Sequence, residues 1–165
     1  MKNFKPILFI FCSILIISCA KEPDFDILIK NGQLIDGSGN KSIIGDIAIN
    51  DDTISAIGNL DGKTGKKEID ATGLTIAPGF INMLSWANES LIEDGRSQGD
   101  IRQGVTLEVL GEGNSMGPLT ESMKKEMKDG QSTIKYDVSW TTLGEYMEYL
   151  ENKGVSTNIA SFIGN

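Results

Sequence analysis

The sequence predicts an α/β protein in which a strand-rich N-terminal part is followed by alternating strands and helices. Between Phe25 and Ile76, short segments alternate apolar and polar residues and are separated by Gly, Asn and Asp, as in strands with one solvated face. At Pro78-Gly79 this pattern changes, and nearly continuous apolar runs then alternate with helix-forming segments. Such alternation indicates βα units and a parallel sheet.

The strand-rich part is predicted to contain two hairpins and two further strands. Asn31-Gly32 lies between two alternating segments, which is a strong hairpin signal. Asn50-Asp51-Asp52 joins the second pair of segments in the same way. The expected strands are residues 26–30, 33–36, 46–49, 53–57, 67–70 and 74–76, and we expect them to form an antiparallel sheet.

Three apolar segments in the second part are predicted to be buried strands, with helices between them. The strongest helix signal is the capping box Thr142-x-x-Glu145, which is followed by Gly154 as a stop. The expected strands are residues 80–84, 105–110 and 158–163, and the expected helices are residues 97–103, 121–128 and 142–153.

The N-terminus has the layout of an export signal. Lys2 and Lys5 precede an apolar run over residues 6–17, which is shorter than the roughly 20 residues that a transmembrane helix needs. The run ends in Ile16-Ile17-Ser18-Cys19, which resembles the lipobox of bacterial lipoproteins. This resemblance implies that residues 1–18 are a cleaved signal peptide and that Cys19 is lipid-modified; the alternatives are an ordinary cleaved signal or an uncleaved anchor.

A lipidated Cys19 would tether the mature chain to a membrane through residues 19–24. Ala20 follows the cysteine instead of Asp, which resembles lipoproteins that are sorted onward to the outer membrane. We therefore expect a cell-envelope protein on the periplasmic side of the outer membrane. Cys12 leaves with the signal, so the mature chain has no free thiol and no disulfide. Loss of the two lysines changes the net charge from −8 to −10, which argues against nucleic acid as a partner.

Three segments in this order and spacing resemble the amidohydrolase superfamily, in particular its N-acyl-D-amino-acid deacylase branch. They are Asp26-Ile27-Leu28-Ile29-Lys30-Asn31-Gly32 with Leu34-Ile35-Asp36-Gly37; Ile69-Asp70-Ala71-Thr72-Gly73 with Ala77-Pro78-Gly79-Phe80-Ile81; and Gln103-Gly104-Val105-Thr106 with Leu110-Gly111-Glu112-Gly113. The resemblance implies an N-terminal β subdomain over residues 25–77 and the first units of a TIM-type (β/α)8 barrel over residues 78–165. Because the chain ends directly after an apolar strand-like run, we expect the barrel to be truncated at Asn165.

The resemblance also implies metal-assisted hydrolysis of linear amide C–N bonds other than peptide bonds, with a divalent metal such as zinc activating water. The family carries His-x-His after its first barrel strand, two residues after an Asp. Here Asn82 stands at the Asp position, and Leu84 and Trp86 stand at the His positions. Neither of those two side chains can bind a divalent cation. Glu112 lies near the position of a later family ligand and is our candidate metal ligand; the alternative is a solvated loop carboxylate.

Other expectations concern the substrate and the remaining site. The implied substrate is a small N-acylated amino acid, and Arg96 is a candidate for holding its carboxylate, with a surface loop charge as the alternative. Trp86 is either a substrate-stacking residue or barrel packing. The sequence has no histidine, so catalytic residues and zinc ligands are expected beyond Asn165, and we expect these 165 residues alone to be inactive. The rival interpretation is a metal-free envelope lipoprotein that uses the barrel as a binding module.

Overall fold

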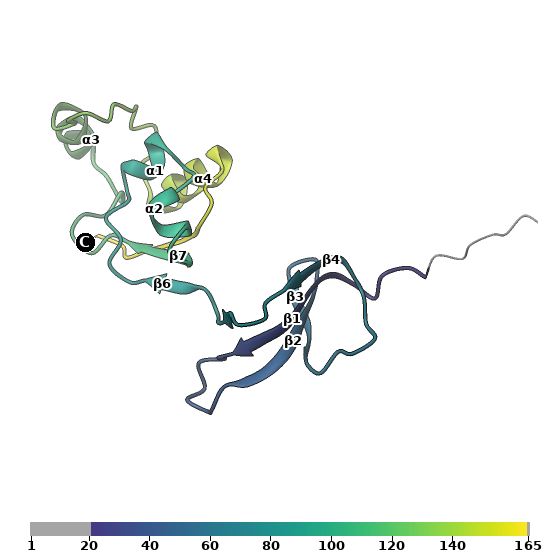
Figure 1. Ribbon diagram of the computed structural model, residues 1–165. Coiled ribbons are helices and arrows are strands. Elements are labelled where there is room, and N and C mark those ends of the chain that lie inside the picture. Colours follow the sequence, from purple (N-terminus) through teal and green to yellow (C-terminus); the bar gives the residue numbers. More distant parts are fainter. Residues whose placement is uncertain (1–20, 165) are drawn as a thin grey trace, which may run out of the picture. The chain divides into compact units, whose positions relative to one another are not determined.

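The computed structural model describes residues 21–164, so the predicted signal peptide and the lipidation site Cys19 lie outside the described residues. The chain divides into two compact units between Ile76 and Ala77. Figure 1 labels most of the elements of both units. No helix in residues 21–164 has the length and apolar character required to cross a membrane.

The first unit is a mixed β-sheet. Its strands are β1 (Phe25–Leu34), β2 (Ile43–Asn50), β3 (Thr53–Gly58), β4 (Gly65–Asp70) and β5 (Thr75–Ile76). The order is β3-β2-β1-β4, and β5 also pairs with β1. β2 runs antiparallel to β1 and β3, as expected, but β4 and β5 run parallel to β1, so the prediction of an antiparallel sheet is only partly right.

The predicted hairpin at Asn31-Gly32 is wrong, because β1 continues through these residues as one strand. Ile29 pairs with Ile47 and Gly32 pairs with Gly45, so Lys30 and Asn31 together oppose the single residue Asp46. This is a β-bulge, and Asn31 adopts a left-handed conformation with φ of 62° that Asn tolerates.

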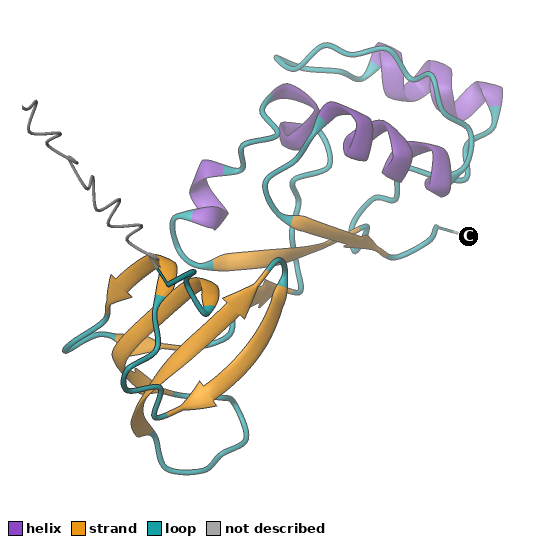
Figure 2. Ribbon diagram, turned by 90° about the vertical axis from the view of Figure 1, so that its right-hand side faces the viewer, coloured by secondary structure: helices purple, strands orange, loops and turns teal. Residues whose placement is uncertain are grey.

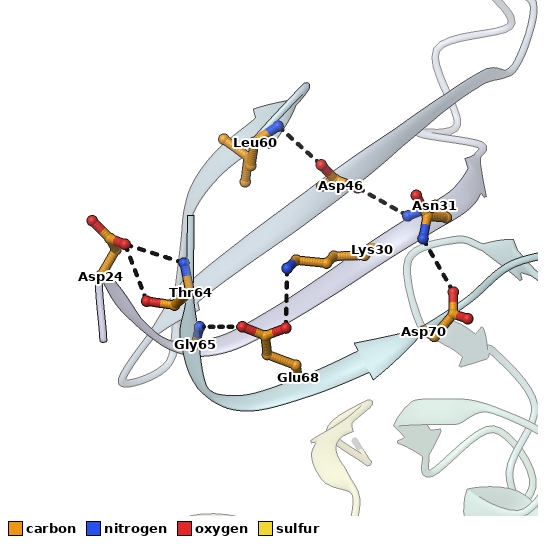
Figure 3. A network of polar contacts seen from close by, with 9 residues as sticks. All are labelled: Asp24, Lys30, Asn31, Asp46, Leu60, Thr64, Gly65, Glu68 and Asp70. Atoms are coloured by element: carbon orange, nitrogen blue, oxygen red, sulfur yellow. Dashed lines mark hydrogen bonds and ion pairs between the residues drawn. The ribbon is translucent and has the colours of Figure 1, made fainter. Parts of the chain in front are cut away.

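The carboxylate of Asp46 stabilises the bulge. It is buried and accepts the backbone N–H of Asn31 at 2.9 Å and that of Leu60 at 2.9 Å, so two amides outside the regular ladder are satisfied (Figure 3). The predicted turn over residues 50–52 is confirmed between β2 and β3. There Asp51 takes a φ of 53°.

One face of this sheet is aliphatic over four strands. Directly paired residues point to the same side, and the register aligns Ile69, Ile29, Ile47 and Ile57 in one row and Ile27, Ile49 and Ile54 in the next. The bulge shifts the alternation of β1 by one residue, so Leu34 lies on this same face. On the opposite face, Leu28 and Ala48 pair with each other and are fully buried.

The second unit contains a parallel sheet and four helices. Its elements are β6 (Phe80–Asn82), α1 (Ser90–Glu93), α2 (Gln98–Ile101), β7 (Val105–Leu110), α3 (Glu121–Asp129), α4 (Leu143–Lys153) and β8 (Asn158–Ser161). The strands run parallel in the order β6-β7-β8, as predicted from the βα pattern. In Figure 2 the helices of this unit (purple) lie to one side of its strands.

A cluster of buried side chains joins α1 and α4 to β7. Its members are Leu91, Ile92, Leu110, Met116, Leu119, Trp140, Tyr146 and Leu150. The predicted capping box is present: Thr142 accepts from the backbone N–H of Glu145, and the Glu145 side chain accepts from that of Thr142. Because Tyr146 and Leu150 are four residues apart, α4 presents both to the core.

Two predicted strands of this unit are shorter than expected. The segment 80–84 forms only the three-residue strand β6, and the segment 158–163 ends as a strand at Ser161. The expectation that residues 80–84 are buried on both faces is wrong for these residues, because Phe80, Ile81, Met83 and Leu84 are all more than half exposed.

Candidate functional site

The candidate site lies at the carboxyl ends of β6, β7 and β8. Because the three strands are parallel, these ends meet at one edge of the sheet, where the active sites of parallel α/β sheets and barrels lie. The segments that follow β6 and β7 carry the residues singled out from the sequence, namely Leu84, Trp86 and Glu112.

Asn82, at the position of the family's aspartate, has a local structural role. Its Nδ2 donates to Asp100 Oδ1 at 3.1 Å, and its Oδ1 accepts the backbone N–H of Leu84 at 3.2 Å. These contacts fix the turn after β6 and link it to α2. Asn82 is therefore used to shape the loop.

Leu84 and Trp86, at the positions of the family's histidines, are exposed. Trp86 is 73% exposed, and its ring lies against Gly113 in the loop after β7. A Cβ on Gly113 would lie 2.8 Å from ring carbon Cη2, so a larger residue there would require the ring to move. Asn88 Nδ2 also donates to Asn114 O at 2.9 Å, so the two loops are joined twice.

Glu112 is exposed on the same loop as Gly113. Within residues 21–164 no three His, Cys, Asp or Glu side chains are grouped so that they could hold a metal ion. A catalytic zinc needs about three protein ligands. The described residues therefore do not fit a metal centre by themselves, and Glu112 stays a candidate ligand only.

Arg96 is paired within its own loop. Its Nε donates to Asp94 Oδ1 at 2.8 Å and its Nη2 to Asp94 Oδ2 at 2.8 Å. The guanidinium, by these hydrogen bonds first, lowers the pKa of Asp94 to about 2. A substrate carboxylate would have to compete with Asp94 for Arg96, so the role of Arg96 in substrate binding stays a prediction.

Sequence reasoning did not single out Glu108, which is the most unusual polar residue of this unit. Glu108 lies in β7 and is fully buried. Its Oε2 accepts from Ser85 Oγ at 2.6 Å, and its Oε1 accepts from Ser97 Oγ at 2.7 Å and from Thr157 Oγ1 at 2.9 Å. The signal available in the sequence was a charged residue inside the apolar run Val105–Leu110.

The Glu108 cluster fixes three segments to β7. Ser85 precedes Trp86 in the loop after β6, Ser97 precedes α2 in a left-handed conformation with φ of 41°, and Thr157 precedes β8. Because three hydroxyl groups from separate segments donate hydrogen bonds to the buried Glu108 side chain, the cluster acts as a structural anchor. It thereby positions the loop that carries Trp86.

Comparison with known proteins finds relatives that cover most of this chain, although no protein-family model matches it. The chain is 29% identical over 145 residues to D-aminoacylase of Alcaligenes xylosoxydans xylosoxydans, covering 86% of this chain and 29% of that protein. It is 28% identical over 141 residues to N-acyl-D-aspartate deacylase of the same organism, covering 85% of this chain and 28% of that protein.

Two solved structures agree with these relatives. A crystal structure of D-aminoacylase, described as defining a novel subset of amidohydrolases, superposes with a TM-score of 0.71 at 26% identity over 85% of this chain and 30% of that one. N-acyl-D-glutamate deacylase from Bordetella bronchiseptica, complexed with zinc and a phosphonate mimic of the tetrahedral intermediate, superposes with a TM-score of 0.68 at 27% identity, covering 85% and 29%.

Sequence and structure thus match the chain to the amidohydrolase superfamily. Within that superfamily the match is to D-aminoacylase and the N-acyl-D-amino-acid deacylases, which confirms the family expected from the three sequence segments. The strand-rich first unit and the β/α second unit match the N-terminal region of these barrel proteins, which confirms the predicted fold class. The chain spans less than a third of the length of these relatives.

Proposed function

We propose that the protein is a hydrolase of linear amide C–N bonds that acts on N-acyl-D-amino acids in the cell envelope. The observation that supports this most directly is the similarity, over about 85% of the chain, to D-aminoacylase, N-acyl-D-aspartate deacylase and N-acyl-D-glutamate deacylase. The predicted export signal and Cys19 support the part of this proposal that concerns location, a lipid-anchored protein outside the cytoplasm.

The proposed hydrolase would require a metal ion, and the residues at the family's ligand positions bear directly on this requirement. A related D-aminoacylase has a binuclear metal centre, and the Bordetella relative was solved with zinc. Here Leu84 and Trp86 stand at two of the family's ligand positions, so Glu112 is the remaining candidate zinc ligand among these residues. We expect residues 19–165 alone to bind no divalent metal tightly and to hydrolyse no N-acyl amino acid.

A second candidate function is a metal-free binding module on the same barrel. The observation that favours it is the exposed apolar pair Leu84 and Trp86 at the position of the family's histidines. In this case the protein would bind an N-acylated compound at the carboxyl ends of the strands and release it unchanged.

The test is to incubate the full-length protein, with added zinc or with a chelator, with N-acetyl-D-glutamate, N-acetyl-D-aspartate and N-acetyl-D-leucine, and with their L-enantiomers. Zinc-dependent release of free D-amino acid would support the hydrolase. Binding without release by a zinc-supplemented sample would support the binding module instead.

Metal content separates the role of Glu112 from a general surface effect. We expect Glu112→Ala to lower bound zinc and activity in the full-length protein. Glu126→Ala, which removes an exposed carboxylate on α3, should change neither. Equal metal content in the two variants would show that Glu112 is a solvated loop carboxylate and does not bind the metal.

A further inference from the structure

We propose that Trp86 is the platform on which the acyl group of the substrate packs; the identity of this ligand rests on the proposed function. Trp86 lies at the carboxyl-end edge of the parallel sheet and is 73% exposed, and Met83 and Leu84 beside it are more than half exposed. Exposed apolar residues that include a large aromatic side chain are typical of a binding site.

The backbone before Trp86 is held firmly in place. The backbone N–H of Ser85 donates to Val109 O at 3.0 Å, and Ser85 Oγ donates to the buried carboxylate of Glu108 at 2.6 Å. These two bonds attach the residue that precedes Trp86 to the central strand β7.

The backbone after Trp86 is held as well. Asn88 O accepts from Tyr146 Oη at 2.8 Å, and Asn88 Nδ2 donates to Asn114 O at 2.9 Å. Tyr146 itself is fully buried in the core of the second unit. An exposed aromatic residue between two anchored segments is preorganised, so binding a ligand costs little additional ordering.

The ring itself is braced by Gly113. A Cβ at this glycine would lie 2.8 to 3.3 Å from three ring carbons, so the indole rests directly on the backbone of the loop after β7. This contact limits the rotamers of Trp86 while most of its surface stays open to solvent.

The surroundings of the ring select the acyl end of an N-acyl amino acid. Trp86, Leu84 and Met83 offer apolar surface, which suits a hydrocarbon or aromatic acyl group. We therefore expect the acyl end of the substrate to pack on Trp86.

The experiment varies only the acyl group. Dissociation constants of N-acetyl-, N-butyryl- and N-benzoyl-D-glutamate are measured by calorimetry with the full-length protein, its Trp86→Ala variant and its Met123→Ala variant. Met123 is a partly exposed apolar residue on α3 and serves as the matched control. In the unmodified protein and in Met123→Ala we expect benzoyl to bind about 3- to 10-fold more tightly than acetyl, the size of an aromatic pair contact. In Trp86→Ala this preference should disappear.

A spectroscopic measurement keeps the inference testable if Trp86→Ala proves hard to purify. The difference in fluorescence between the unmodified protein and Trp86→Phe isolates the emission of Trp86, and we expect N-benzoyl-D-glutamate to quench it. Gly113→Ala should weaken the benzoyl preference, because its Cβ displaces the ring.

The outcomes separate this inference from the proposed function. An acyl preference that depends on Trp86, in a protein that hydrolyses none of these compounds, would support the platform and refute the deacylase. Hydrolysis with the same acyl preference in Trp86→Ala as in the unmodified protein would overturn the platform and leave the deacylase standing. Absence of binding by all three compounds would also overturn the platform.

Discussion

Replacing Glu108 by alanine is expected to destabilise the second unit by several kcal/mol. The substitution removes the acceptor of three hydroxyl groups, of which Ser85 and Thr157 are buried. A buried hydroxyl left without a partner costs about 1–3 kcal/mol. Because Ser97 is only partly buried and can turn to water, we count the two buried groups and expect a loss of about 2–6 kcal/mol.

Glu108→Gln separates the hydrogen bonds from the volume of the side chain. The amide keeps one acceptor oxygen and nearly the same volume, and a serine hydroxyl can turn to accept from its N–H. We therefore expect a loss of about 1–2 kcal/mol for this variant. Glu126→Ala, at an exposed carboxylate on α3, should stay within about 0.5 kcal/mol of the unmodified protein.

Urea unfolding followed by tryptophan fluorescence is a suitable assay. The two tryptophans of the sequence, Trp86 and Trp140, both belong to the second unit, and Trp140 is 2% exposed. The free energies of unfolding are compared between variants that show the same slope of free energy against urea concentration. A loss below 1 kcal/mol in Glu108→Ala, or equal losses in the alanine and glutamine variants, would refute the reasoning from buried hydroxyls.

Three further predictions concern the anchor, the first unit and the helix caps. Cys19→Ser should leave the protein unprocessed or soluble in the periplasm, and labelled fatty acid on this variant would contradict lipidation. The backbone N–H of Thr64 is the main cause that lowers the folded-state pKa of Asp24 from 3.8 to about 2, so its stabilisation is present above about pH 4 and is lost as the pH falls through 2. Asp24→Asn should therefore melt at a lower temperature at pH 7 and at an unchanged temperature well below pH 2; a constant difference across this range would be inconsistent. Thr142→Ala should cost about 1 kcal/mol of global stability, whereas Thr120→Ala should affect only hydrogen exchange in α3, which contains no buried residue; equal global losses would contradict this distinction.

Elements with local signals were predictable from the sequence. The capping box of α4 depends on residues three positions apart, and the turn between β2 and β3 depends on Asn50 and Asp51. Both signals act within a few residues, so the sequence shows them directly. The family segments likewise predicted the fold class of both units.

Features that depend on distant partners were missed. Asn31-Gly32 has the composition of a hairpin turn, but Asp46 on the neighbouring strand satisfies the Asn31 amide and the strand continues. The hydroxyl partners of Glu108 lie 23, 11 and 49 residues away in sequence, so no local window contains the cluster. The candidate site was predictable only in part for the same reason. Its family ligand positions could be located from a sequence motif, whereas the contacts between its loops depend on how β6 and β7 pack.

The bulge in β1 also gives the first sheet a place where the chain can change its length. Deleting Asn31 would leave Lys30 opposite Asp46, with Ile29 and Gly32 on either side keeping their present partners. The side chains that follow would stay on their present face, whereas deleting Ile47 from β2 would turn the rest of that strand over. Asp46 would lose one amide donor and keep the other, from Leu60. One-residue deletions among homologous sequences should therefore be found at this position more often than elsewhere in the sheet.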